Sequence, residues 1–366
     1  MKNENDKIIL KNYSPICFIT DSKLIVAKKN NIYSYCLLTS KFDHIVSLPS
    51  SLTNRLLESN KYAHRVLRKG IRYGVKLSAN KILLVYQKLF YEIDLIKKNV
   101  TEVFKLERGN RPLNIAKIDS IKGFKNSFCF GEYFGNFEKE EVNIYSREVN
   151  GTWSVSYTFP KNTIEHIHAI IPDKFRDCVW IFTGDLNDSA AIWKATEDFK
   201  VVTPVLLGKQ EYRACVGFPI KEGLIYATDS QFCTNSIRIM ILDKNDNWVS
   251  KHLEDVNGPV IYGCQHKENF IFSTSVEGES EKKGRLLKYF DNKPGKGIKE
   301  NYSHLVMGQY ENGFHLIKKY KKDMFPFILF QFGAIIFPSG VNNSDYLVSS
   351  NIALSRFNQS TILQKF

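Results

Sequence analysis

Residues 128–136 read FCFGEYFGN, and the stretch continues as VNIYSREVNGTWSVSYTF (142–159), IEHIHAII (164–171) and VWIFTGDLND (179–188). These short runs are rich in β-branched and aromatic residues and are separated by turn-forming residues, a pattern typical of β-strands. The stretch contains most of one four-stranded group and the beginning of the next. It therefore predicts a fold built from a repeated all-β unit.

The same grouping recurs along the whole chain with a period of about fifty residues, within the range of propeller blades. Long amphipathic helix patterns are scarce. We expect one domain with seven four-stranded blades, and six blades is the alternative. The expected blades span approximately residues 15–50, 62–107, 113–160, 164–207, 211–254, 259–320 and 325–366.

The last two blades are the least regular. The sixth is expected to use RLLKYF (285–290) as its third strand and FHLIKKY (314–320) as its fourth, after a long insertion. The seventh is expected to begin with FILFQF (327–332), followed by AIIFPSG (334–340) and two further strands. The early segment KIIL (7–10) is a candidate for an additional strand that closes the ring.

Composition limits the function classes. The 366 residues are 43% hydrophobic, which suits a soluble globular protein with a large core, and the net charge of +13 favours an anionic partner. The seven cysteines show no CxxC spacing, so reduced thiols are expected. No nucleic-acid module, nucleotide-binding loop or membrane span is recognised, and the N-terminus lacks the apolar region of a signal peptide, so a cytoplasmic protein is expected.

One turn carries a family resemblance. Residues 146–153, SREVNGTW, resemble the Asp-box pattern S-x-D-x-G-x-T-W, with Glu148 and Asn150 in place of Asp and Gly. Asp243 and Trp248 keep two positions of a second copy, and residues 196–198 are a weaker third. The chain thus resembles sialidase-like (BNR-repeat) propellers, in which such boxes stabilise hairpins on the face opposite the ligand site. The Phe/Tyr-Arg-Ile-Pro motif of sialidases is absent, so sialidase activity itself is not expected.

Residues that begin first strands and end second strands of propeller blades are expected to meet around one mouth. This rule gathers a set of polar side chains: His64, Arg65, Arg68, Glu132, Tyr133, His166, His168, Asp185, Tyr212, Arg213, Asp229, Tyr262 and Glu277.

His166 and His168 form an H-x-H motif on a predicted strand, so their side chains face the same way. That spacing suits two imidazoles on one divalent metal ion, or a general base with a supporting neighbour. The motif is similar to the metal-binding histidine pair of oligogalacturonate lyases, which are also propellers, although Thr163 stands where that family's pattern offers Gln. Two histidines hydrogen-bonded in the wall of the mouth are the structural alternative.

The carboxylates and the Tyr-Arg pair complete the candidate site. Glu132 and Asp185 are candidate catalytic acid/base groups together with His166, His168 and Tyr212. The candidate substrate-binding residues are Arg213, Tyr133, Arg68, Asp229 and Glu277. Arginine can clamp a substrate carboxylate while tyrosine or histidine removes the adjacent proton.

Two main functional hypotheses follow, and a scaffold that uses its outer faces is a third possibility. The first is a carbohydrate-active enzyme that cleaves an acidic glycan or oligosaccharide by β-elimination or by glycosidic hydrolysis. The second is a propeller that binds a glycan or a protein without catalysis, because this fold serves many unrelated functions.

Overall fold

The computed structural model describes residues 7–278 and 287–365. The chain forms seven four-stranded antiparallel sheets, and the protein is an all-β, seven-bladed β-propeller, as the sequence predicts. Contacts between Cα atoms divide it into two compact units, which are residues Met1–Val103 with Tyr262–Phe366 and residues Phe104–Ile261. We call them the terminal unit and the central unit.

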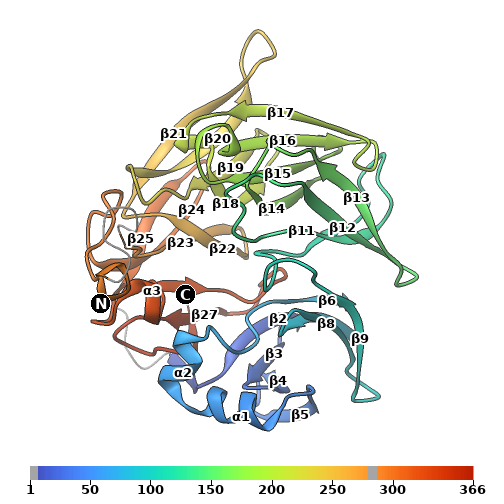
Figure 1. Cartoon of the computed structure of the whole chain (residues 1–366), viewed down its shortest axis with the longest axis vertical. Coiled ribbons are helices and arrows are strands. Elements are labelled where there is room, and N and C mark those ends of the chain that lie inside the picture. Colours follow the sequence, from blue (N-terminus) through green and yellow to red (C-terminus); the bar gives the residue numbers. More distant parts are fainter. Residues whose placement is uncertain (1–6, 279–286, 366) are drawn as a thin grey trace. The chain divides into compact units, whose positions relative to one another are not determined.

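The central unit contains three sheets (Figure 1). The first contains β10 (Ala116–Ile118), β11 (Ser127–Gly131), β12 (Val142–Glu148) and β13 (Trp153–Phe159). The second contains β14 (His166–Asp173), β15 (Cys178–Gly184), β16 (Ala191–Thr196) and β17 (Val201–Leu207). The third contains β18 (Ala214–Pro219), β19 (Leu224–Thr228), β20 (Asn235–Leu242) and β21 (Trp248–Val256).

The terminal unit holds the other four sheets. The first contains β2 (Ser14–Thr20), β3 (Lys23–Lys28), β4 (Asn31–Cys36) and β5 (Phe42–Ser47). The second contains β6 (Gly74–Ser78), β7 (Lys81–Tyr86), β8 (Leu89–Asp94) and β9 (Asn99–Lys105). The next contains β22 (Val260–His266), β23 (Asn269–Thr274), β24 (Tyr302–Gln309) and β25 (Gly313–Lys321). The last contains β26 (Ala334–Ile336), β27 (Tyr346–Ile352), β28 (Ser360–Lys365) and β1 (Lys7–Lys11).

Both ends of the chain build the last sheet. Strand β1 pairs antiparallel with β28, with Ile9 opposite Ile362, so the N- and C-terminal strands lie side by side. The expectation that KIIL adds a closing strand is confirmed. Pairing the first strand with the last shields a sheet edge that would otherwise have unpaired N–H and C=O groups.

The sequence prediction was wrong in two segments. FILFQF is not a strand, because Phe327–Phe330 form the short helix α3, and AII (334–336) is the first strand of that sheet. In the preceding sheet YSHLVMGQ (302–309) is the third strand, whereas Leu287–Phe290 form a 3-10 turn. Arg285 and Leu286 of the expected RLLKYF strand lie outside the described residues. A short apolar run has no periodicity that separates a buried helix from a strand.

Two helices lie in the segment of chain that connects the first two sheets, where the sequence analysis predicted neither a helix nor a strand. Helix α1 (Leu52–Ser59) begins at Ser51, whose hydroxyl accepts a hydrogen bond from the Asn54 N–H. Helix α2 (Lys61–Val66) begins at Asn60, whose side chain accepts from the N–H groups of Tyr62 and Ala63. Both caps satisfy backbone donors that have no partner inside the helix. In the described residues no helix is long and apolar enough to cross a membrane.

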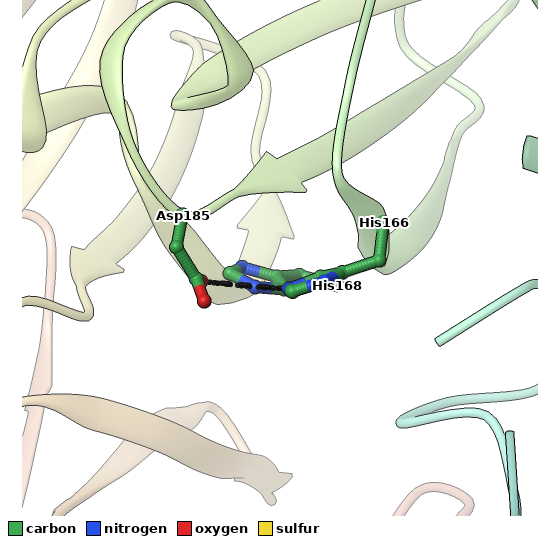
Figure 2. Close-up of side chains that lie close together, drawn as sticks. All are labelled: His166, His168 and Asp185. Atoms are coloured by element: carbon green, nitrogen blue, oxygen red, sulfur yellow. Dashed lines mark hydrogen bonds and ion pairs between the residues drawn. The ribbon is translucent and has the colours of Figure 1, made fainter. Parts of the chain in front are cut away.

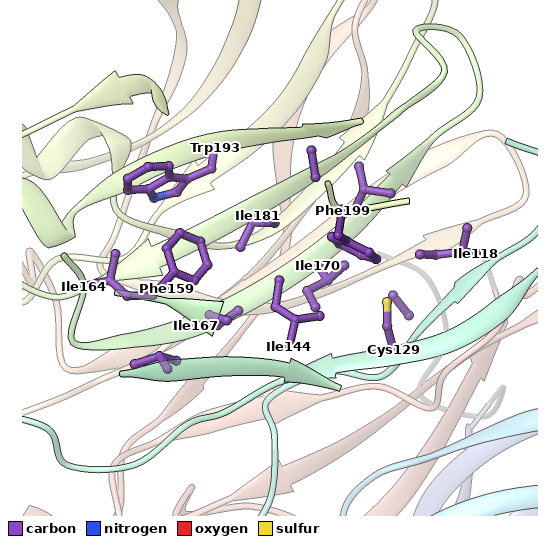
Figure 3. Packing of buried hydrophobic residues seen from close by; sticks show 14 of the residues in the cluster. Ile118, Cys129, Ile144, Phe159, Ile164, Ile167, Ile170, Ile181, Trp193 and Phe199 are labelled. Atoms are coloured by element: carbon purple, nitrogen blue, oxygen red, sulfur yellow. The ribbon is translucent and has the colours of Figure 1, made fainter. Parts of the chain in front are cut away.

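The core of the central unit lies between neighbouring sheets. Figure 3 shows the cluster between the β10–β13 and β14–β17 sheets, where Ile144 and Phe159 pack against Ile167 and Ile181. Burying apolar side chains of this size contributes about 1.5–3 kcal/mol each. Strand β14 is buried along almost its whole length, so the histidines at its beginning are carried by one of the best-packed strands of the unit.

Two of the predicted turns are present, and in each a side chain accepts hydrogen bonds from backbone N–H groups. In the 148–152 turn the side chain of Asn150, not that of Glu148, accepts the Thr152 N–H. Asp243 accepts the N–H groups of Asn245 and Asn247. Kinship with sialidase-like proteins stays a prediction. All seven cysteines are free thiols, as expected, and five of them are buried.

Candidate metal and substrate site

The first strand of the second central sheet brings two imidazoles together. His166 Nε2 lies 3.0 Å from His168 Nε2 at the beginning of β14. The pairing of β14 with β15 shifts by one residue between Ile167 and Ala169, so His168 sits in a β-bulge. A bulge re-aims a side chain, and here it turns the His168 ring toward that of His166 (Figure 2).

Each imidazole is oriented by a backbone carbonyl. His166 Nδ1 lies 3.2 Å from the carbonyl oxygen of Phe134, and His168 Nδ1 lies 3.0 Å from that of Ala214. A carbonyl oxygen only accepts, so the proton resides on Nδ1 in both rings and both Nε2 atoms present a lone pair. This arrangement is typical of metal-binding histidines, whose second nitrogen donates to a carbonyl or carboxylate.

Asp185 completes the group. It follows the last residue of β15, and its Oδ1 lies 3.1 Å from His168 Nε2 and 3.5 Å from His166 Nε2 (Figure 2). Its backbone is fixed on both sides, because its N–H donates to Glu165 and its carbonyl accepts from Gln210. Three acceptor atoms therefore converge on one point, and such a group requires a positive charge between its members, either a proton or a metal ion.

The spacing of these atoms fits a metal ion. Ligands at about 2.1 Å from a cation are roughly 3.0 Å apart when they subtend 90° and about 3.4 Å apart when they subtend 109°. The three observed separations lie between 3.0 and 3.5 Å. Two histidines and one carboxylate on one side of a metal, with open positions on the other, are a common set for divalent transition metals.

Arg213 contacts the same oxygen of Asp185 as the two histidines. Its guanidinium is buried, with one terminal nitrogen 3.1 Å from Asp185 Oδ1 and 3.7 Å from Asp229 Oδ2. Burial alone would raise the pKa of Asp185, but the contacts with the His166 and His168 rings and the charge of Arg213 outweigh burial and hold that pKa well below its usual range. Asp185 is thus an anion at any ordinary pH, as a metal ligand must be.

A second group, His168, Cys215 and Asp229, is also close enough to hold a metal ion. Cys215 occupies a bulge at the beginning of β18, the place that His168 occupies in β14, and its thiol lies 3.1 Å from Asp229 Oδ2. Burial and the charge of Asp229 raise the pKa of Cys215 well above its ordinary value. The thiol therefore remains protonated and donates to Asp229, so the first group is the better metal site.

Of the other predicted residues in the central unit, Tyr133 adjoins the metal group, whereas Glu132 and Tyr212 have separate environments. Glu132 follows β11 as predicted, but its buried carboxylate is held by Arg108, a residue that the sequence analysis did not single out. Tyr133 is half-buried, with its ring centroid 4.6 Å from that of His166. Tyr212 packs in the hydrophobic cluster that also contains Trp180.

Five predicted residues lie in the terminal unit, and one of them, Tyr262, packs against the hydrophobic cluster that contains Ile271 and Ile335. Arg65 is buried in α2 and forms an ion pair with Asp323, at 2.8 Å, and His64 accepts a hydrogen bond from Gln359. Arg68 is exposed just after α2. Glu277 accepts a hydrogen bond from the hydroxyl of Ser275. The residues that the structure brings together in the central unit are therefore Tyr133, His166, His168, Asp185, Arg213 and Asp229.

A scan against models of known protein families gives no match, and neither does a comparison with curated protein sequences. Solved structures do share the fold. An oligogalacturonate lyase in complex with manganese is similar, with a TM-score of 0.59 and 12% identity over 99% of this chain and 91% of the other. The oligogalacturonate lyase of Vibrio parahaemolyticus gives a TM-score of 0.56 and 12% identity over 99% and 92%.

The fold is not confined to lyases. A CNH domain is similar as well, with a TM-score of 0.56 and 6% identity over 98% of both chains. At these identities the likeness establishes the propeller fold, and the function must be argued from the site.

Proposed function

We propose that this protein is a carbohydrate-active propeller that holds a divalent cation at His166, His168 and Asp185 and cleaves an acidic oligosaccharide by β-elimination. The observation that carries the proposal is the orientation of both imidazoles. Each Nδ1 is engaged by a carbonyl, and both Nε2 lone pairs converge with Asp185 Oδ1. The manganese-bound lyase with the same fold supports a metal at such a site.

The chemistry of the surrounding residues suits a uronate substrate. β-Elimination removes the proton next to a sugar carboxylate and expels the glycosidic oxygen, so a double bond forms and the oxygen leaves protonated. A bound divalent cation would supply positive charge to bind and neutralise the substrate carboxylate. Arg213 adds a second positive charge to the same place, and its planar guanidinium suits a carboxylate.

Tyr133 is the side chain to which we assign the proton transfer. Its ring lies edge-on against His166, and it is half-buried at the rim of the metal group. A nearby cation lowers the pKa of a phenol and favours its basic form. Glu132 and Tyr212, which the sequence analysis placed among the catalytic residues, are committed to an ion pair and to a hydrophobic cluster, respectively.

The test combines metal binding with product analysis. Mn²⁺ is titrated calorimetrically into chelator-treated wild-type protein and into His168→Ala, with His252→Ala as the control, because His252 also pairs with an aspartate but is exposed. We expect binding in wild type and in the control and a loss of at least about tenfold in His168→Ala. Equal binding by all three proteins would refute the metal site.

Activity is then measured on oligogalacturonate, with and without Mn²⁺. Elimination gives an unsaturated product that absorbs ultraviolet light, whereas hydrolysis gives reducing ends without unsaturation. We expect the unsaturated product, and we expect Tyr133→Phe to abolish turnover but retain Mn²⁺. Saturable binding of the oligosaccharide without cleavage would instead support the hypothesis of a binding propeller.

A further inference from the structure

The terminal unit contains a cavity of about 420 Å³ that has no part in the proposed function. Helix α2 and the segment 69–72 form one side, and residues of β26, β27 and the segment 358–359 form the other. This volume lies within the range of small-molecule sites, which is about 300–1,000 Å³.

The lining of this cavity is strongly basic. The lining includes one acidic residue, Glu58, and six lysines and arginines: Lys28, Lys29, Lys61, Arg65, Lys69 and Arg72. Lys29 donates to Ser59 Oγ and Lys69 to Asn54 Oδ1, each at 2.8 Å, so both use neutral partners. Within the described ranges none of the four lysines lies within ion-pair distance of a carboxylate. Glu58 interacts electrostatically with Lys29 and Lys69, but the lining still has an excess of positive charge. A concave site with an excess of charge of one sign concentrates ions of the other.

Arg65 contributes a buried positive charge to this lining. Its side chain is 5% exposed, and its terminal nitrogens contact Asp323 and the carbonyl of Phe330. Its Nε has no hydrogen-bond partner among residues 7–278 and 287–365. A buried N–H without an acceptor is costly.

The remaining lining defines the chemical class of the ligand. Lysine binds phosphate as a compact point charge. The lining also offers short amide and hydroxyl side chains, which suit sugar hydroxyls: Asn12, Ser14, Ser350, Asn358 and Gln359. Among the described lining residues there is no Phe, Tyr or Trp on which a nucleobase could stack.

We propose that this cavity is a binding site for a phosphorylated sugar. The phosphate contacts Lys29 and Lys69, and the sugar hydroxyls contact the amide and hydroxyl side chains. The site stands independently of the metal group in the central unit, because none of its lining residues belongs to that unit.

The proposal is tested by calorimetric titration at fixed ionic strength with glucose 6-phosphate, inorganic phosphate, glucose and galacturonate. We expect saturable binding of glucose 6-phosphate, weaker binding of inorganic phosphate, and none of glucose. Lys29→Gln and Lys69→Gln are each expected to weaken binding about tenfold, since each removes one charge-assisted contact. Lys251→Gln removes an exposed lysine of the central unit and is expected to change nothing.

Circular dichroism and thermal unfolding of each variant establish that the fold is retained. Failure of both phosphate compounds to bind would overturn the proposal. Galacturonate binding more tightly than glucose 6-phosphate would also overturn it, and so would an equal loss in Lys251→Gln.

Discussion

The imidazole of His168 lies against the Cα of Gly184, the last residue of β15. A methyl group at position 184 would come within 2.1 Å of His168 Cε1 and 2.5 Å of Nε2. The absence of a side chain at this position is therefore what allows the ring to reach His166 and Asp185.

Gly184→Ala is expected to displace His168 and to weaken Mn²⁺ binding at least about tenfold, because one of three ligands leaves the group. Gly135→Ala is the matched control, since a methyl group there would meet no atom within 4 Å. Calorimetric titration of both variants checks the prediction. If Gly184→Ala binds Mn²⁺ like Gly135→Ala, then His168 is not a ligand.

Asp185→Asn keeps the size of the side chain and removes its charge. The amide cannot supply the anionic oxygen that the two histidines face, so we expect Mn²⁺ affinity to fall by one to two orders of magnitude, about 10–100-fold. The same change leaves the contact between Arg213 and Asp229 in place. Titration with Mn²⁺ measures the effect, and Asp255→Asn, in the exposed pair with His252, is the control. An unchanged affinity would exclude Asp185 from the metal group.

The ion pair of Glu132 and Arg108 is expected to stabilise the central unit. The Glu132 side chain is 2% exposed and that of Arg108 is 33% exposed. Arg108→Met leaves a buried carboxylate that still accepts a hydrogen bond from the Asn143 N–H but has lost its counter-ion, and we expect a loss of about 2–4 kcal/mol in unfolding free energy. Glu132→Gln is expected to lower the unfolding free energy less than Arg108→Met does. It removes the buried negative charge and, with it, the need for a counter-ion.

Urea unfolding of the two single variants and the double variant gives the coupling energy, expected at about 0.5–3 kcal/mol. Lys161→Met breaks the exposed pair with Glu140 and serves as the control, with an expected change below about 1 kcal/mol. An Arg108→Met variant as stable as Lys161→Met would show that Glu132 needs no counter-ion.

The blades could be predicted because their signal is local. Runs such as VWIFTGD and AIWKAT carry strand composition between turn residues, and the structure places them in β15 and β16. The sequence prediction was wrong where the local composition fits a helix as well as it fits a strand. FILFQF follows Pro326 and forms a helix whose Phe330 ring packs near Tyr62, a residue far away in the sequence.

The histidine pair and the strand-end carboxylates could also be predicted, because H-x-H spacing and the ends of second strands are visible in the sequence. The bulge at His168 and the carbonyls of Phe134 and Ala214 could not, since they depend on pairing between distant segments. Arg108 lies in a loop without periodicity, so no pattern marked it. Cys215 repeats the position of His168 two residues after Arg213, and alignment of the two strands would have revealed it.

His64 is expected to make the fold sensitive to acid. Burial and the charge of Arg72 lower the pKa of His64 to about 4, from an ordinary value of 6.5. Below pH 6.5 the unfolded chain therefore binds a proton that the folded state does not accept until about pH 4. Unfolding free energy is fully retained above pH 6.5 and falls as the pH decreases, by at most about 1.4 kcal/mol per pH unit from this group.

His64→Gln removes the titrating ring and keeps a side chain able to hydrogen-bond Gln359. We expect the variant to lose less stability than wild type between pH 7 and pH 5, by about 2 kcal/mol at most. Urea unfolding at several pH values measures the two slopes. His315 is exposed on β25, so His315→Gln is expected to follow wild type. Parallel curves for wild type and His64→Gln would contradict the assignment, because the proton excluded from the folded state would then belong to another group.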